Sequence, residues 1–251
     1  MKNRKGNCST CLPLVLFSVL LFMSVVTSCA HVSPFARSEE YYFQALGDAD
    51  QMVATLDVPT MRPFLNETSL AQAGGDLVLD RADRLSFSME QTAGNDGSSW
   101  NYQGALEGNY SRFLVNAALA GQPDFTKQNH DGQNWFESSY GLKMGIPRNG
   151  IILFTSGDWI SHYHTSMEER TIRIPGDIAV KMAEAPLGIY VKQPHTMPLL
   201  TFDVPIGFLM QTEEAYFALV PGENGIALSS GMIAMKDGKL ANSLNILLRS
   251  S

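Results

Sequence analysis

The chain has 251 residues, of which 45% are hydrophobic and 17% charged, so it is long enough to bury a sizeable core. Its 25 acidic side chains outnumber the 18 basic ones, which gives a formal charge of −7. Because this balance repels phosphate backbones and anionic headgroups, we expect no nucleic acid among its partners.

The N-terminal segment, residues 1–28, has the parts of an export signal. Lys2, Arg4 and Lys5 form a basic start, and a largely apolar run follows from Leu12 to Val26. A bilayer requires about 20 apolar residues, so the run is too short for a transmembrane helix. We therefore predict that residues 1–28 are a signal peptide.

Cys29 ends this segment, directly after Val26-Thr27-Ser28. The arrangement resembles the lipobox of bacterial lipoproteins, although Val26 stands where leucine is usual. The resemblance implies that the Cys29 thiol carries a diacylglycerol, that the signal is cleaved before it, and that fatty acyl chains such as palmitate bind the protein to the membrane. An ordinary secretory signal or an uncleaved anchor is the alternative. Ala30 is not the aspartate associated with inner-membrane retention, which favours the outer membrane and a domain facing the periplasm or the exterior.

Little else in the chain is informative about its compartment. Cys8 and Cys11 form a CxxC inside the signal, so we assign it no function and expect no structural disulfide in the mature protein. From Cys29 onward the chain carries 15 basic and 25 acidic side chains, a charge of −10, and contains no second hydrophobic span.

Hydrophobic periodicity and turn residues divide the mature chain into four parts. Residues 29–38 form a tether, and residues 39–125 form a first half with helices over 39–46, 64–79 and 111–120 and strands over 52–58, 84–91 and 101–107. Residues 126–171 contain a hairpin with arms over 135–146 and 150–155, followed by a helix over 158–170. Residues 172–251 form a second half.

The two halves resemble each other in sequence. Residues 50–65 match residues 185–200 at a shift of 135, and residues 102–120 match residues 231–249 at a shift of 129. The matched pairs include Pro59 with Pro194, Pro63 with Pro198, Leu65 with Leu200, Ala105 with Ala234, Asn116 with Asn245 and Leu119 with Leu248. We predict an α+β fold of two related halves, each in the order helix, strand, helix, strand, strand, helix, with a mostly antiparallel sheet and helices on one face. A chance match of small and apolar residues is the alternative.

The mature chain has no GxSxG, HExxH, phosphate-loop or GxGxxG motif, and we expect a protein that is not an enzyme and needs no cofactor. The weak metal candidates are His162, His164 and Glu168. On a strand the two histidines would share a face and could converge on a metal ion, whereas on the predicted helix they diverge. We therefore expect no metal site, and an exposed helix face with a His164–Glu168 pair.

Three functions remain open. The leading one is a membrane-anchored, non-enzymatic binding or assembly module of the cell envelope with an unidentified protein partner. The second is a carrier of an apolar ligand, which requires a deep, dry pocket. The third is a metal-dependent hydrolase built on the segment that contains His162 and His164.

Overall fold

The structure is a computed structural model that describes residues 42–46, 52–66, 76–94, 97–168, 174–194, 210–222, 225–239 and 241–242. Its strands are β1 (Met52–Asp57), β2 (Ala82–Gly94), β3 (Gly97–Gly108), β4 (Phe125–His130), β5 (Gln133–Ser138), β6 (Lys143–Arg148), β7 (Ile151–Thr155), β8 (Leu187–Lys192), β9 (Thr212–Gly222) and β10 (Gly225–Met235). Its helices are η2 (Tyr42–Ala45), α2 (Val58–Asn66), α3 (Asp76–Leu79), α4 (Arg112–Ala120), α5 (Trp159–Met167) and α6 (Gly176–Glu184).

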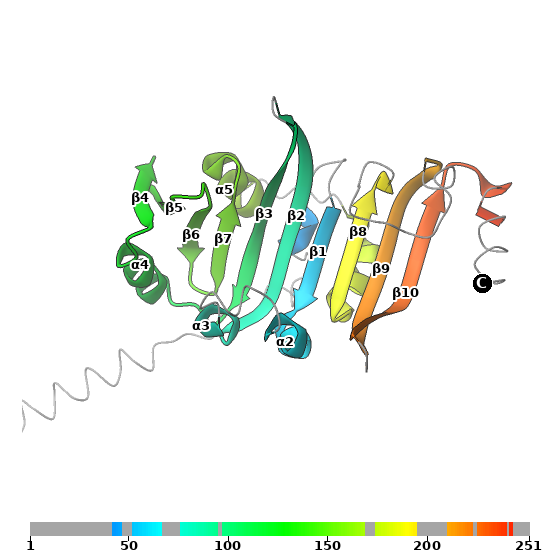
Figure 1. The fold of residues 1–251 in the computed structure, drawn as a ribbon, viewed down its shortest axis with the longest axis horizontal. Coiled ribbons are helices and arrows are strands. Elements are labelled where there is room, and N and C mark those ends of the chain that lie inside the picture. Colours follow the sequence, from blue (N-terminus) through cyan, green and yellow to red (C-terminus); the bar gives the residue numbers. More distant parts are fainter. Residues whose placement is uncertain are drawn as a thin grey trace, which may run out of the picture.

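All ten strands form one sheet in the order β10-β9-β8-β1-β2-β3-β7-β6-β5-β4, and every neighbouring pair is antiparallel (Figure 1). The α+β fold with an antiparallel sheet is therefore confirmed. Strands from both predicted halves lie in this sheet, so the two halves share one structural layer.

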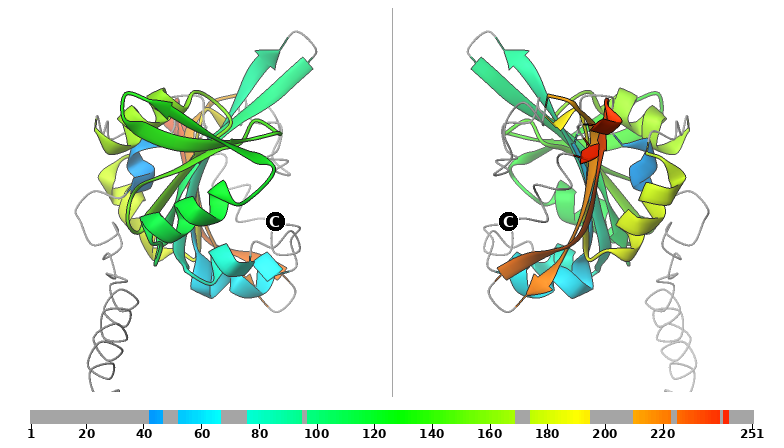
Figure 2. Two further views of the ribbon diagram at one scale, coloured as in Figure 1. Left: turned by 90° about the vertical axis from the view of Figure 1, so that its left-hand side faces the viewer. Right: turned by 90° about the vertical axis from the view of Figure 1, so that its right-hand side faces the viewer.

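Helices cover both faces of the sheet, which corrects the expectation of helices on one face (Figure 2). On one face, Val53 and Leu153 belong to a core cluster with Trp159 of α5 and Met182 of α6. On the other face, Leu56 belongs to a second cluster with α2 and α3, against which α4 packs. Strand side chains alternate between the faces, so the apolar neighbours along strands such as β1 and β7 need cover on both sides.

The strand order around β1 is mirrored about the pair β1 and β8. Strands β1, β2 and β3 follow one another to one side, and β8, β9 and β10 follow one another to the other side. Strand β8 begins at Leu187, which is 135 positions after Met52 at the start of β1. The shift of 135 between the first two matched segments therefore relates two strands that are neighbours in the sheet.

Several element boundaries differ from those predicted. The arm predicted over residues 135–146 is two strands, β5 and β6, and β4 was not predicted. The helix predicted over 64–79 is α2, which starts at Val58, and α3, with residues 67–75 outside the described part. Residues 39–41 of the first predicted helix also lie outside it, as do most residues of the helix that ends the predicted second half.

Two strand glycines let helices approach the sheet closely. A Cβ atom on Gly145 of β6 would lie 2.6 Å from the ring of Trp159, and one on Gly188 of β8 would lie 2.9 Å from the Cα atom of Met182. Both distances are shorter than van der Waals contact, so only glycine fits without movement. These contacts fix α5 and α6 on their face of the sheet.

Candidate interaction surface

Cys29, the predicted lipid attachment site, lies outside the described residues. In the part of the chain that the structure describes, no helix is long and apolar enough to cross a membrane.

His162 is buried, with 2% of its surface exposed, which corrects the expectation of an exposed polar helix face. Its Nε2 atom donates to the carbonyl oxygen of Gly104 on β3 at 3.2 Å, and its Nδ1 atom lies 3.2 Å from the hydroxyl of Ser166, which then donates to it. Burial lowers the pKa of His162 to about 4, and the bond to Gly104 opposes only part of that shift. The imidazole is therefore neutral at pH 7, with both nitrogens engaged.

His164 lies on the exposed side of α5, where its Nδ1 atom pairs with a carboxylate oxygen of Glu168 one helical turn later. The helix itself is as predicted, with Asp158 as its N-cap accepting from the backbone N–H of Ser161 at 2.7 Å. His162 and His164 thus diverge. Among the described residues, no group of three or more His, Cys, Asp or Glu side chains is placed to hold a metal ion.

The second candidate feature is the helix α4, whose boundaries match the prediction. Ser111 is its N-cap and accepts from the backbone N–H of Leu114, and Gly121 follows its last turn. Val115 and Leu119, one helical turn apart, pack against the second core cluster. The start of α4 is also held by a hydrogen bond from the Arg112 backbone N–H to the side-chain oxygen of Asn149, at 2.9 Å.

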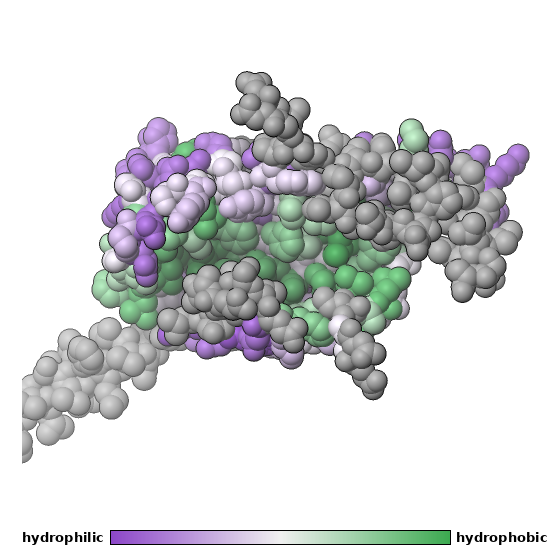
Figure 3. Space-filling view, in the orientation of Figure 1, coloured by the Kyte–Doolittle hydropathy of each residue, from purple (hydrophilic) through white to green (hydrophobic). Residues whose placement is uncertain are grey.

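No residue of α4 is buried, although its sequence is apolar. Phe113 is 78% exposed and Leu114 is 47% exposed. Figure 3 shows apolar surface at the position of α4, at the left edge of the molecule. Arg112 is the one charged residue between Asn109 and Pro123, so no polar face accompanies the exposed apolar side chains.

A groove with a volume of about 220 Å³ separates α4 from the hairpin β4–β5. Phe113, Asn116, Ala117 and Ala120 line it from the helix, where their spacing places them on one stripe. The strands supply its other lining residues, which are Lys127, Asn134 and Phe136. Lys127 and Phe136 are register partners, so both side chains lie on the helix-facing side of the hairpin.

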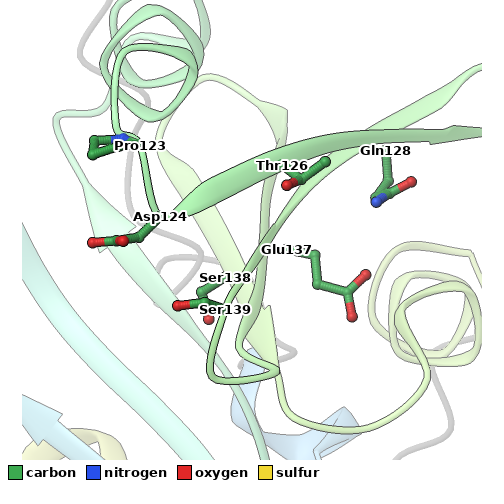
Figure 4. A pocket seen from close by; sticks show the side chains of 7 residues that line it. All are labelled: Pro123, Asp124, Thr126, Gln128, Glu137, Ser138 and Ser139. Atoms are coloured by element: carbon green, nitrogen blue, oxygen red, sulfur yellow. The ribbon is translucent and has the colours of Figure 1, made fainter.

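The opposite side of the hairpin has a polar groove of about 300 Å³, shown in Figure 4. Its lining residues are Pro123, Asp124, Thr126, Gln128, Glu137, Ser138 and Ser139. The carboxylates of Asp124 and Glu137 point to opposite sides in Figure 4, so they form neither an acid/base pair nor a cation site. The Ser138 hydroxyl accepts from the backbone N–H groups of Tyr140 and Leu142, which commits it to the turn.

Aromatic packing joins the hairpin to α5. The rings of Trp135 on β5 and Trp159 on α5 are stacked with centroids 6.0 Å apart. Beyond this contact, Tyr140 in the turn after β5 is 88% exposed. We call α4, the hairpin β4–β5 and this turn the α4 surface.

Sequence reasoning did not single out Phe113, Lys127 or Tyr140. One signal was available, because the helix predicted over residues 111–120 contains a single charge and therefore lacks the polar face of an ordinary surface helix. The groove itself had no signal, since it depends on how β4 and β5 meet the helix.

Comparison with protein-family profiles and with curated proteins finds no match. Solved structures of the treponemal protein TP0453 are similar in fold. Crystal form I has a TM-score of 0.58 at 12% identity and covers 82% of both chains, and form III has a TM-score of 0.57 at 10% identity over 82% of this chain and 85% of the other. Crystal form IV has a TM-score of 0.55 at 12% identity over 74% of this chain and 77% of the other. The chain therefore shares the fold of TP0453 over most of its length.

Proposed function

We propose that the protein is a lipid-anchored component of the bacterial cell envelope, held at the outer membrane by Cys29, and that its domain is a non-enzymatic binding or assembly module. The observation that carries the binding role is α4, whose apolar residues Phe113 and Leu114 are exposed without a polar face. Large apolar surface rimmed by polar residues is typical of protein interaction sites.

The spacing between Cys29 and the described domain fits such a role. Residues 30–41 separate Cys29 from Tyr42, the first residue that the structure describes. A chain of this length spans at most about 45 Å, since an extended residue covers about 3.3–3.6 Å. With a lipid on Cys29, the domain would stay within that distance of the membrane and search for partners near its surface.

A photocrosslinking experiment in cells tests the binding role. Replacing Phe113 by the photoreactive residue benzoylphenylalanine should give discrete protein adducts after irradiation, because this position would face the partner. The same residue at Val180, an exposed position on α6, is the matched control and should give none of these adducts. Equal adduct patterns at the two positions, or no adducts at Phe113, would contradict a docking role for the α4 surface.

A carrier of an apolar ligand is the second candidate, because one observation favours it. Strands β1, β2, β3 and β8 supply all the described residues of a third apolar cluster, and Figure 3 shows an apolar strip across this face of the sheet. Its partly buried members are Phe87, Met89, Trp100 and Ile189. A co-purified lipid in native mass spectra, lost on Phe87→Arg, would support this candidate.

The two halves, we infer, arose by duplication. The mirrored strand order about β1 and β8 and the two sequence shifts support this origin. Sequence profiles built separately from relatives of residues 39–125 and 172–251 should match each other at those shifts. Matches at other offsets would contradict a duplication.

A further inference from the structure

We propose that the groove between α4 and the hairpin β4–β5 binds an acidic peptide segment of a partner protein, with one large apolar side chain of that segment inserted against Phe136. This inference rests on the proposed binding role and names the chemistry of the partner.

The size of the groove favours a single side chain as the occupant. Small-molecule sites have volumes of about 300–1,000 Å³, so 220 Å³ is too small for a whole lipid or cofactor. Protein interfaces instead concentrate their binding energy in a few side chains that fill pockets of this kind. The side chain of Phe136 is 2% exposed, and Phe113 stands at the rim where it can close over an inserted group.

Charge at the groove favours an acidic partner. Lys127 on β4 is the one charged side chain among the described residues that line the groove, and Arg112 is exposed at the start of α4. The carboxylates of Asp124 and Glu137 line the polar groove on the other side of the hairpin. In a mature chain with a charge of −10, a groove whose described lining contains a cation and no carboxylate favours acidic segments, which would be repelled elsewhere.

The polar lining suits a peptide. Asn116 on α4 has a carboxamide that can donate to and accept from a peptide group, and no hydrogen bond within the described part of the chain engages this side chain. Asn134 accepts from Asn129 at 3.0 Å and keeps its own amide hydrogens for a second partner. A flat membrane surface would use neither the pocket nor these amides.

Fluorescence anisotropy with synthetic peptides tests the inference on the full-length lipoprotein in nanodiscs of zwitterionic lipid. The probe is a fluorescein-labelled acidic peptide, Asp-Glu-Asp-Phe-Asp-Glu-Asp, with one matched peptide that has Ala for Phe and another that has Lys for every acidic residue. The first peptide should bind, and the other two should bind at least about tenfold more weakly, because each lacks one of the two recognised features.

Variants locate the site. Lys127→Glu should weaken binding of the acidic Phe peptide about tenfold or more, and Ala117→Trp should abolish it by filling the groove. Lys181→Glu, an exposed position on α6, makes the same change of charge elsewhere and should leave binding unchanged. Circular dichroism checks that each variant is folded.

Three results would overturn the inference. These are equal binding of all three peptides, equal effects of Lys127→Glu and Lys181→Glu, and no peptide binding combined with Phe113-dependent binding to phosphatidylglycerol vesicles, which would make the surface a membrane contact. If protein adducts form at Phe113 in cells while no acidic peptide binds, the binding role stands and the acidic partner is wrong. If those adducts are absent, the binding role itself fails.

Discussion

The imidazole of His162 and the carbonyl oxygen of Gly104 are 3.2 Å apart, and this hydrogen bond joins α5 to the middle strands of the sheet. A Cβ atom on Gly104 would lie 2.3 Å from the carbonyl oxygen of Ser86 and 2.5 Å from the ring of Phe154, so this position on β3 fits only glycine without movement. The carbonyl of Gly104 can only accept, so Nε2 carries the proton and Nδ1 is left to accept from Ser166. His162 therefore serves as a structural residue that requires a neutral ring.

Replacing His162 by Ala should lower the free energy of unfolding by about 1–3 kcal/mol, because the change leaves a small cavity and removes the hydrogen bonds of the ring to Gly104 and Ser166. His164→Ala, on the exposed side of the same helix, is the matched control and should change it by less than about 0.5 kcal/mol. Urea denaturation of both variants measures the difference. Similar values for the two would show that the contact between His162 and Gly104 contributes nothing.

The low pKa of His162 predicts a loss of stability in acid. The folded pKa is about 4 and the ordinary value is 6.5, so the unfolded chain binds the proton more readily between these values. Stability from this group is complete above pH 6.5 and falls, by about 3 kcal/mol in total, as the pH decreases toward 4. Denaturation curves at pH 7 and pH 4.5 should show this loss, and His162→Gln should reduce it. An unchanged pH dependence in that variant would assign the effect to other groups.

Gly188→Ala should destabilise the protein by about 1–3 kcal/mol, because the added Cβ would lie 2.9 Å from the backbone of Met182 and the helix must move. Gly176→Ala is the control, since nothing lies within 4 Å of a Cβ at the start of α6. Thermal unfolding should show a lower Tm for the first variant and an equal or higher Tm for the second. A Gly188→Ala protein as stable as the parent would mean that α6 is not fixed by this contact.

Cys29→Ser should abolish incorporation of labelled fatty acid and move the protein to the soluble or precursor fraction, because only this cysteine follows the apolar run. Metabolic labelling with an alkyne fatty acid, followed by gel fluorescence, measures it. The control is Cys11→Ser, which should label normally. Labelling of Cys29→Ser at the level of the parent would exclude this lipid anchor.

Local signals in the sequence predicted the elements that depend on neighbours in the chain. Hydrophobic periodicity predicted the helix over residues 111–120, which is α4, and the apolar run from Met52 predicted β1. Strand β4 was missed because its polar residues lie on both faces, which removes the alternation that marks a strand. The pair Asp131-Gly132 was an unused hairpin signal, and both residues have positive φ angles.

Features that depend on distant contacts were harder to predict. Trp159, His162 and Ser166 share one face of α5 at helical spacing, and this pattern could have placed the histidine inside. The partner carbonyl of Gly104 lies 58 residues away, and no local pattern points to it. The same holds for the groove beside α4, whose walls come from a helix and a hairpin that meet only in the folded chain.

The position of β1 has a consequence for how the chain is made. One edge of β1 pairs with β2, which follows soon after it, and the other pairs with β8, which is synthesised only after β2 to β7 and α6. Until β8 arrives, the central seam of the sheet is an open strand edge, which is a template for aggregation. A polypeptide that stops before Leu187 would keep that edge exposed, so the proposed export would require the chain to stay unfolded until the residues of β8 have crossed the membrane.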